Sequence, residues 1–288
     1  MNPDPLFSVL VANYNNGRCL QEAIGSVLAQ TYTNWEIIIV DDGSTDNSLE
    51  LYKQLEQDSR IHVFYNEGNK GCGYTKRRCA ELANGSICGF LDPDDLLLSD
   101  ALEKHIKIHV NYPDTSVIYS RCYDCNSKGE VIGKSRLLHL KENETYFDYR
   151  WYGSMHFASY KKSYYDKTEG ISQSIRAGVD QDLYFKLEEV GKIYVLNEFT
   201  YKYIHRNPNA ITKNLGKLWY WNMEVRRAAC IRRGLDADTI LSQDWDYLIN
   251  QFKEDAAYEK MQQIRNTRAF RLGKFLLKPF YIIKNIVK

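Results

Sequence analysis

Four continuous apolar runs, separated by stretches with helical spacing, constrain the fold of this chain more than any other feature. The runs are LFSVLVANY (6–14), WEIIIVDD (35–42), RIHVFYN (60–66) and SICGFLD (86–92). Apolar residues recur with helical periodicity in the intervals 18–30, 45–58 and 75–85. Buried strands that alternate with helices are typical of a parallel sheet covered on both faces. We therefore expect an α/β fold with a mainly parallel, Rossmann-like sheet.

Polar side chains gather where each of these strands ends. The four clusters are Asn13-Tyr14-Asn15, Asp41-Asp42-Gly43-Ser44, the loop NEGNKGCGYTKR (66–77) and Asp92-Pro93-Asp94-Asp95. In open α/β sheets, ligands bind beyond the carboxyl ends of the strands. The sequence therefore predicts a binding site at this edge. Asp46 is expected to cap the second helix.

The pattern loosens after residue 115. Strands are expected at 116–124 and 128–136, with the second returning against the first through Lys128-Gly129. A helix over 180–191 and the strand KIYVLNE follow, and the chain is expected to be helical beyond them. We expect a catalytic domain over 1–206 and a helical extension over 207–288.

The charge distribution is uneven although the net charge is only +1, which gives no signal of nucleic-acid binding. Residues 260–288 contain eight Lys and Arg residues and no acid, so the rest of the chain carries a charge of −7. With Pro279 dividing it, this tail has the pattern of a basic amphipathic helix that binds an anionic membrane. Packing of the same apolar stripe on the catalytic domain is the alternative.

The cysteines and the lengths of the apolar runs indicate the cellular compartment of the protein. Seven cysteines at irregular spacing indicate reduced thiols. The N-terminus has the pattern of a strand and not of a signal peptide. No window of 18 apolar residues occurs, so a transmembrane helix is not expected. These features favour a cytoplasmic protein, peripheral on the inner membrane if the tail binds lipid.

The segment ICGFLDPDDLLLSD contains three carboxylates within four positions, Asp92, Asp94 and Asp95. Dense negative charge next to an apolar strand is costly unless a cation neutralises it. Hard divalent cations prefer carboxylate oxygens. Short acidic clusters also occur in calcium loops, so this motif alone does not identify the site.

Longer blocks give a resemblance. SVLVANYNNGRCLQEAIGSVLAQTYTNWEIIIVDDGSTDNS resembles the opening of glycosyltransferase family 2, whose members are inverting enzymes with the GT-A fold. NKGCGYTKR, FLDPDDLLLSDALEKH, VDQDLYFKLEEVGKIY and YIHR agree in order and spacing. The resemblance implies transfer of a sugar from a nucleotide-diphosphate donor, preferentially a UDP-sugar. The acceptor it implies is a saccharide or lipid-linked saccharide in the synthesis of bacterial surface polysaccharide.

The resemblance also assigns site residues. It implies a Mn²⁺ or Mg²⁺ ion on Asp94, Asp95 and His205. The donor nucleotide is expected to contact Ala12, Tyr14, Asp41, Asp42, Lys76, Arg77, Asp92 and Asp94. Lys76 stands where relatives usually have Arg, which removes the bidentate fork. The alternatives are turn and cap roles for the aspartates, a solvated helix face for the two basic residues, and a solvent-exposed position without a ligand for His205.

Asp180 matches the position of the general base, which takes the proton of the acceptor hydroxyl. Many relatives have Glu directly before it, where this chain has Val179. The alternative role of Asp180 is a helix N-cap. Asp182 and Trp151, the latter within an aromatic-rich stretch, are expected near the acceptor.

Two other classes of protein remain open. One is a non-catalytic scaffold of the same fold that binds a nucleotide sugar and a metal. The other is a sugar nucleotidyltransferase, although NYNNGRC is a poor version of the phosphate loop that it requires. A nicotinamide enzyme is disfavoured because GCG follows the third strand and lacks a third glycine.

Overall fold

The structure is a computed structural model that describes residues 4–137, 140, 144–148, 156–206 and 215–251. The chain divides into two compact units, Met1–Lys213 and Asn214–Lys288. The domain boundary expected from the sequence lies after residue 206. No helix of the described residues is long and apolar enough to cross a membrane.

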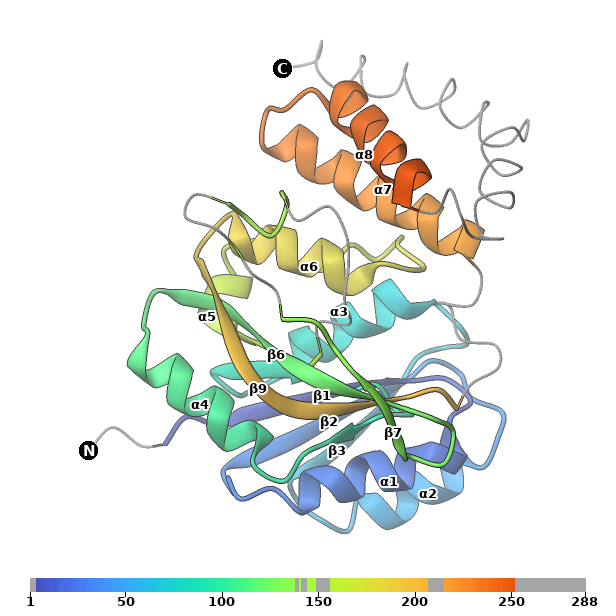
Figure 1. The fold of residues 1–288 in the computed structure, drawn as a ribbon. Helices are drawn as coiled ribbons and strands as arrows, with labels where there is room; N and C mark the ends of the chain where they lie inside the picture. The colour runs from blue at the N-terminus through green and yellow to red at the C-terminus, as the bar shows by residue number, and fades with distance from the viewer. Residues whose placement is uncertain (1–3, 138–139, 141–143, 149–155, 207–214, 252–288) are drawn as a thin grey trace. The chain divides into compact units, whose positions relative to one another are not determined.

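The alternating strands and helices expected in the first half are present (Figure 1). They are β1 (Phe7–Asn13), α1 (Gly17–Leu28), β2 (Trp35–Asp41), α2 (Ser48–Leu55), β3 (Ile61–Tyr65), α3 (Cys72–Leu82) and β4 (Ile87–Phe90). One detail is corrected. The second helix has Asn47 at its N-cap, and Asp46 lies one residue before it.

The elements that follow are shorter and less regular at first. They are β5 (Leu96–Leu97), α4 (Ala101–Asn111), β6 (Thr115–Cys125), β7 (Val131–Lys134), β8 (Ala158–Lys161), α5 (Lys162–Tyr165), α6 (Val179–Glu188) and β9 (Lys192–Ile204). The predicted return of β7 against β6 is confirmed, and the pair is antiparallel. The last strand continues six residues beyond its predicted end and reaches Ile204.

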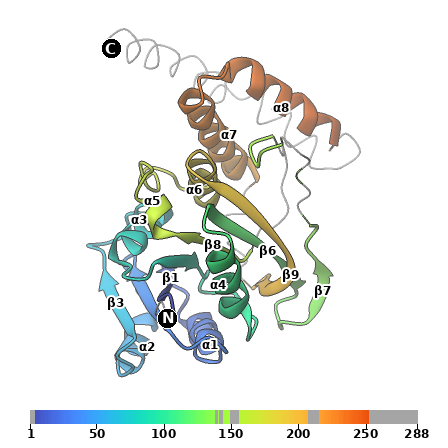
Figure 2. The same cartoon turned by 90° about the vertical axis from the view of Figure 1, so that its left-hand side faces the viewer.

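All nine strands form one sheet, in which β3-β2-β1-β4-β8-β6-β9-β5 are neighbours and β7 adds to β6. The first four strands of this order are parallel, as predicted. Beyond β4 the pairing is mixed, because β8 runs antiparallel to both β4 and β6 while β9 is parallel to β6. The sheet is therefore a parallel half joined to a mixed half (Figure 2).

Helices cover both faces of the parallel half. In Figure 1, α1 and α2 lie below the sheet, and α3 and α6 lie above it. One continuous core joins the lower helices and α4 to the strands, and it includes Val9, Ile24, Ile37 and Leu102. Every residue of β2 is buried, as expected for a strand covered on both faces.

The C-terminal unit contains α7 (Leu215–Arg232) and α8 (Ala237–Gln251). The connection between them turns at Gly234, whose φ of 67° lies in the left-handed region. Arg226 Nε donates to Asp244 Oδ2 at 2.7 Å, and both side chains are buried. The apolar side chains Trp219, Met223, Val225 and Leu241 of these helices are buried as well.

Candidate active site

The carboxyl ends of four parallel strands meet at one edge of the sheet, as predicted. Asn13 lies beside Asp41 in the register of β1 and β2, and Asp41 lies beside Tyr65 in the register of β2 and β3. The predicted donor-binding residue Ala12 is half-buried within β1. Tyr14 is the first residue after the end of β1, and its side chain is exposed.

Asp41 is buried and organises the turn after β2. One carboxylate oxygen accepts the backbone N–H groups of Gly43 and Ser44, at 3.0 and 2.8 Å. The other accepts the Tyr52 hydroxyl at 2.6 Å. Burial, followed by Asp41, raises the pKa of Tyr52, so the phenol stays a neutral donor. These contacts give Asp41 a structural role, and its contact with a nucleotide stays a prediction.

Asp42 holds the loop between β3 and α3. Its carboxylate accepts the side-chain amide of Asn66 and the backbone N–H groups of Lys70 and Gly71, each at 2.8 Å. The side chain is buried. Asp42 therefore fixes a predicted donor-binding loop, and its predicted contact with the base stays untested.

Close backbone packing brings the first turn of α3 against the loop that precedes α6. A Cβ atom at Gly73 would lie 2.5 Å from the carbonyl oxygens of Ser172 and Ile175, so only glycine fits. The Gly73 N–H donates to the Ile175 carbonyl at 3.1 Å. Helix α6 begins after Gly178, which is left-handed with φ 70°, so Asp180 lies in the first turn and is not the N-cap.

Lys76 joins two predicted site residues. Its ammonium lies 2.8 Å from Asp180 Oδ1 and 3.2 Å from Asp92 Oδ1, and its side chain is only 7% exposed. It also lies 5.0 Å from the centre of the Phe90 ring. Burial alone would lower the pKa of Lys76, but the charges of Asp180 and Asp92 hold it well above its ordinary value. The arrangement fixes a cation between the predicted base and the acidic motif.

Asp95 is buried and connects the acidic motif to β9. The Tyr201 hydroxyl donates to one of its oxygens at 2.9 Å, and the Ile204 N–H donates to the other at 2.7 Å. Burial, followed by the charges of Asp92 and Asp94, raises the pKa of Asp95 well above its usual range. The position of the strand end at residue 204 thus depends on this carboxylate.

Asp94 is the member of the motif that fits a metal ion best. Its carboxylate has no side-chain or backbone partner in another described residue. Burial, followed by the charge of Asp92, raises its pKa to about 6, and the positive charges of Arg206 and Lys76 offset this rise only in part. An oxygen donor of this kind suits Mg²⁺ or Mn²⁺, which are commonly held by one or two carboxylates together with phosphate oxygens.

The three predicted metal ligands do not form a cluster in the described part of the chain. No group of three or more His, Cys, Asp or Glu side chains there is arranged to hold a metal ion. His205 Nε2 lies 2.7 Å from Asp124 Oδ1. Of the predicted ligands, Asp94 alone is without a competing partner, so metal binding through Asp95 and His205 stays a prediction.

Other predicted residues have structural contacts. Asp182 is buried, and its Oδ2 accepts the Lys186 ammonium at 2.8 Å and the Ser172 N–H at 3.0 Å. Arg77 donates to Glu81 and to backbone carbonyls of the loop that precedes α6. These contacts account for both side chains without a ligand. Trp151 lies outside the described residues, so its acceptor role is untested.

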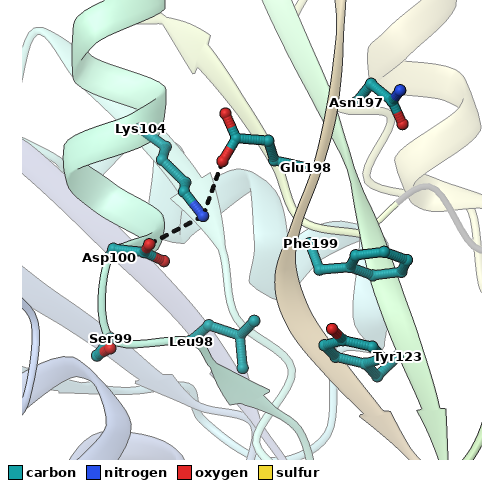
Figure 3. Close-up of a pocket in the computed structure, with 8 residues that line it drawn as sticks. All are labelled: Leu98, Ser99, Asp100, Lys104, Tyr123, Asn197, Glu198 and Phe199. Carbon is teal, nitrogen blue, oxygen red and sulfur yellow. Dashed lines mark ion pairs between the residues drawn. The ribbon is translucent and has the colours of Figure 1, made fainter.

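Figure 3 shows a separate hollow of about 530 Å³ that contains none of the predicted site residues. Lys104 pairs with Asp100 and Glu198, each at 2.9 Å, on one side of β9. On the other side, the rings of Tyr123 and Phe199 stack with centroids 4.3 Å apart. The single ammonium of Lys104 is therefore shared by the two carboxylates of this hollow, which keeps a net negative charge.

The fold and this edge define the class of protein. A mixed α/β sheet with carboxylates at the ends of its parallel strands agrees with the GT-A fold that the resemblance implies and has its ligand site at this edge. The model of the family "Glycosyl transferase family 2" matches residues 8–168. The chain belongs to this family.

Curated relatives agree with the assignment. Chondroitin synthase of Escherichia coli is 29% identical over 216 residues, which are 73% of this chain and 30% of that protein. Glycosyltransferase GlyG of Streptococcus pneumoniae is 25% identical over 295 residues and is matched over 96% of both chains. This chain thus spans only about a third of the synthase but nearly all of GlyG.

Solved structures share the fold. Staphylococcus aureus TarS in complex with UDP-GlcNAc has a TM-score of 0.67 at 18% identity, over 87% of this chain and 74% of that chain. Mannosyltransferase PcManGT of Pyrobaculum calidifontis, in complex with GDP-Man and Mn²⁺, has a TM-score of 0.59 at 14% identity, over 94% and 83%. At these identities the likeness concerns the fold.

Proposed function

We propose that this chain is an inverting glycosyltransferase that uses a nucleotide-diphosphate sugar, with UDP as the nucleotide. The acceptor is a saccharide or a lipid-linked saccharide in the synthesis of surface polysaccharide. One observation carries the proposal: Lys76 ties Asp180 to Asp92, so the residue at the position of the base lies beside the acidic motif. The UDP-GlcNAc complex of TarS and the names of the curated relatives support it.

In this proposal, Asp180 takes the proton of the acceptor hydroxyl. The hydroxyl oxygen forms a bond to the anomeric carbon, and the bond between that carbon and the diphosphate breaks on the opposite face. A single displacement of this kind inverts the anomeric configuration. Lys76 holds the Asp180 carboxylate in place through the 2.8 Å ion pair.

Asp94 is the first choice of metal ligand, with Asp95 and His205 as the further predicted ligands. A bound Mn²⁺ or Mg²⁺ ion would neutralise charge on the leaving diphosphate. The chain's own contribution is to hold the motif rigidly, because Tyr201 and Ile204 both donate to Asp95.

The Asp180→Asn variant tests the proposal. Asparagine keeps the shape but not the basicity, so we expect kcat to fall about 10²–10⁴-fold while the Kd for UDP stays unchanged. Calorimetry gives the Kd and a sugar-transfer assay gives kcat, after a screen of nucleotide sugars has identified the donor. Asp166→Asn, at an exposed residue, is the matched control. Parallel loss of UDP binding would assign Asp180 to the donor site instead.

The same screen separates the two other classes of function. A scaffold would bind a nucleotide sugar without transferring or hydrolysing it. A nucleotidyltransferase would release pyrophosphate from a nucleoside triphosphate and a sugar phosphate. Either result with the unmodified chain would contradict the proposal.

We also propose that residues 260–288 bring the enzyme to an anionic membrane surface. These residues lie outside the described part of the chain, so the proposal depends on their eight cations and the absence of acids. A lipid-linked acceptor would be presented at that surface.

A further inference from the structure

The loop of residues 169–178 links the predicted base to α3. It ends at Gly178, directly before α6, so Asp180 lies only two residues beyond it. Helices α3 and α6 lie on the same face of the sheet (Figure 1). Lys76 of α3 contacts Asp180 at 2.8 Å, but one contact with a partly exposed carboxylate does not fix the start of α6. The position of α6 relative to α3 therefore depends on how this loop is held.

Arg77 holds the first half of the loop on α3. Its Nη1 donates to the carbonyl oxygens of Glu169 and Ile171 at 3.0 and 3.2 Å. Its Nε donates to Glu81 Oε1, one turn further along α3, at 2.7 Å, and this pair orients the guanidinium. Arg77 directly follows Lys76 in the sequence, so adjacent residues of α3 hold the loop and contact the predicted base.

Arg176 holds the second half of the loop from the opposite direction. Its guanidinium donates to the carbonyl oxygen of Lys70, in the loop before α3. The guanidinium lies directly against Gly71, where φ is 92° and a Cβ atom would overlap it. In the same region, the Gly73 N–H donates to the Ile175 carbonyl at 3.1 Å. The loop is thus tied to α3 and the residues before it in both halves, by one arginine from each side.

Helix α6 holds the same loop through a buried ion pair. Asp182 Oδ2 accepts the Ser172 N–H at 3.0 Å and the Lys186 ammonium at 2.8 Å. Lys186 also donates to the Gly170 carbonyl at 2.8 Å, and both charged side chains are buried. Because an unpaired buried charge is costly, this pair keeps the loop and the first turns of α6 together. The contacts that fix the loop on α3 therefore also fix Asp180.

We propose that Arg77 and Arg176 are positioning residues, which hold the Asp180 carboxylate in place by fixing this loop on α3. The inference rests on the proposed function, in which Asp180 is the base. Proton transfer needs a contact of about 2.6–3.2 Å between the base and the hydroxyl, so a small displacement of α6 lowers the rate. Arg77 then has a role that differs from the donor contact implied by the resemblance.

Arg77→Gln and Arg176→Gln in the full-length chain test the proposal. Each substitution removes the guanidinium that donates to a backbone carbonyl and leaves a polar side chain. We expect kcat to fall about tenfold in each variant, the equivalent of one charge-assisted hydrogen bond, while the Kd for UDP stays unchanged. Arg77→Lys and Arg176→Lys keep a charged donor without the fork and should recover part of kcat. A sugar-transfer assay gives kcat, and calorimetry gives the Kd.

The same substitutions in the Asp180→Asn background separate positioning from a direct role. If the arginines act through the Asp180 carboxylate, they have no base to position in this background. The value of kcat should then fall no further than in Asp180→Asn alone. Additive losses would overturn the proposal, because the arginines would act independently of the base. A parallel rise in the Kd for UDP would also overturn it and assign the arginines to the donor site.

Arg60→Gln is the matched control. It removes the arginine of a carboxylate pair with Asp58 just before β3, at the opposite end of the strands, and should leave kcat unchanged. Thermal unfolding by circular dichroism confirms that each variant is folded. Where a Gln variant unfolds, the Lys variant gives the same comparison with and without Asp180→Asn.

The catalytic proposal and this inference can fail separately. Unchanged kcat in Asp180→Asn would refute the base and, with it, the positioning of that base. A large loss of kcat in Asp180→Asn together with unchanged kcat in both Gln variants would refute only the positioning role and leave the catalytic proposal intact.

Discussion

Lys76 lies between two carboxylates from distant parts of the chain. One partner is Asp92, which follows β4. The other is Asp180, which lies 104 residues beyond Lys76 in the sequence. The carboxylates are each about one-third exposed, at 33% and 32%, while the ammonium is almost fully buried. An ammonium is a compact charge with three donors, so it can bridge two carboxylates where a planar guanidinium has fixed directions.

Removal of this charge should affect catalysis more than folding. In Lys76→Met, Asp92 and Asp180 would face each other without a cation, and the orientation of Asp180 would be lost. We expect kcat to fall at least about tenfold, within the range of general-base effects. Because both carboxylates reach solvent, the free energy of unfolding should fall by only about 1–2 kcal/mol, less than for a fully buried pair.

Lys76→Arg keeps the charge and should recover part of kcat, although the fork cannot reproduce both ion pairs. Steady-state kinetics and urea unfolding give the two quantities. Equal kcat in Lys76→Met and the unmodified enzyme would show that the ion pairs do not position Asp180.

The sequence predicted the edge of the sheet that carries these residues, because buried strands ending in polar clusters leave little choice of topology. It did not predict the partners. The 2.8 Å contact between Lys76 and Asp180 depends on the packing of Gly73 against the loop before α6, which has no periodic signal. Arg176, which lies in the same loop, was not singled out for the same reason.

At the scale of elements, α4 is held to the mixed half of the sheet by a buried polar network. His105 Nδ1 lies 2.7 Å from Ser159 Oγ, and its Nε2 lies 3.2 Å from Ser120 Oγ. His109 Nε2 lies 2.9 Å from the same Ser159. The two histidines are one helical turn apart, so one face of α4 carries both of them to β6 and β8.

Both histidines should make the protein less stable in mild acid. Burial, followed by the charge of Lys104, lowers the pKa of His105 to about 3. Burial, followed by His105 and Lys161, lowers the pKa of His109 well below its usual value. The unfolded chain binds these protons at an ordinary pKa near 6.5 and the folded chain does not. The free energy of unfolding therefore falls as the pH drops below about 6.5, by about 2 kcal/mol per histidine at pH 5.

Urea unfolding from pH 7.5 to pH 5 measures this dependence. In His109→Gln, the free energy of unfolding should fall less steeply with decreasing pH, by about the contribution of one histidine. Asp94, whose pKa is raised, contributes to the pH dependence with the opposite sign. Its contribution is the same in both proteins, so it cancels when His109→Gln is compared with the unmodified chain. His62→Gln, at a half-exposed side chain, is the control. Parallel pH curves for His109→Gln and the unmodified chain would contradict the expected shift.

Regular elements were easier to predict than irregular ones. The strands and helices up to β4 were found because their apolar residues repeat with a clear period. β5 and β8 were missed because they are only two and four residues long and depend on pairing with distant strands. β9 was predicted too short because its second half alternates polar and aromatic residues instead of continuing the apolar run.

At the scale of the whole molecule, positive and negative charges are separated along the chain, with an excess of cations at the C-terminal end and an excess of acids elsewhere. The eight cations of residues 260–288 are outside the described part, and the remaining residues carry a net charge of −7. A cationic segment attached to an acidic body is attracted to anionic lipid, by roughly 1 kcal/mol for each cation near the surface, and the attraction is screened by salt. We expect the same surface to repel the acidic remainder of the chain, which would favour contact through residues 260–288.

Flotation with liposomes that contain anionic lipid tests this expectation. The full chain should float with the liposomes at low salt, and raising the salt should release it. Replacement of Lys274, Lys278 and Lys284 by Gln should reduce the bound fraction strongly, because three cations together contribute about 3 kcal/mol. Replacement of the exposed Lys53, Lys107 and Lys128 by Gln makes the same change in net charge on the body and should have little effect. If the two triple variants bind equally, net charge governs binding and the tail has no special role.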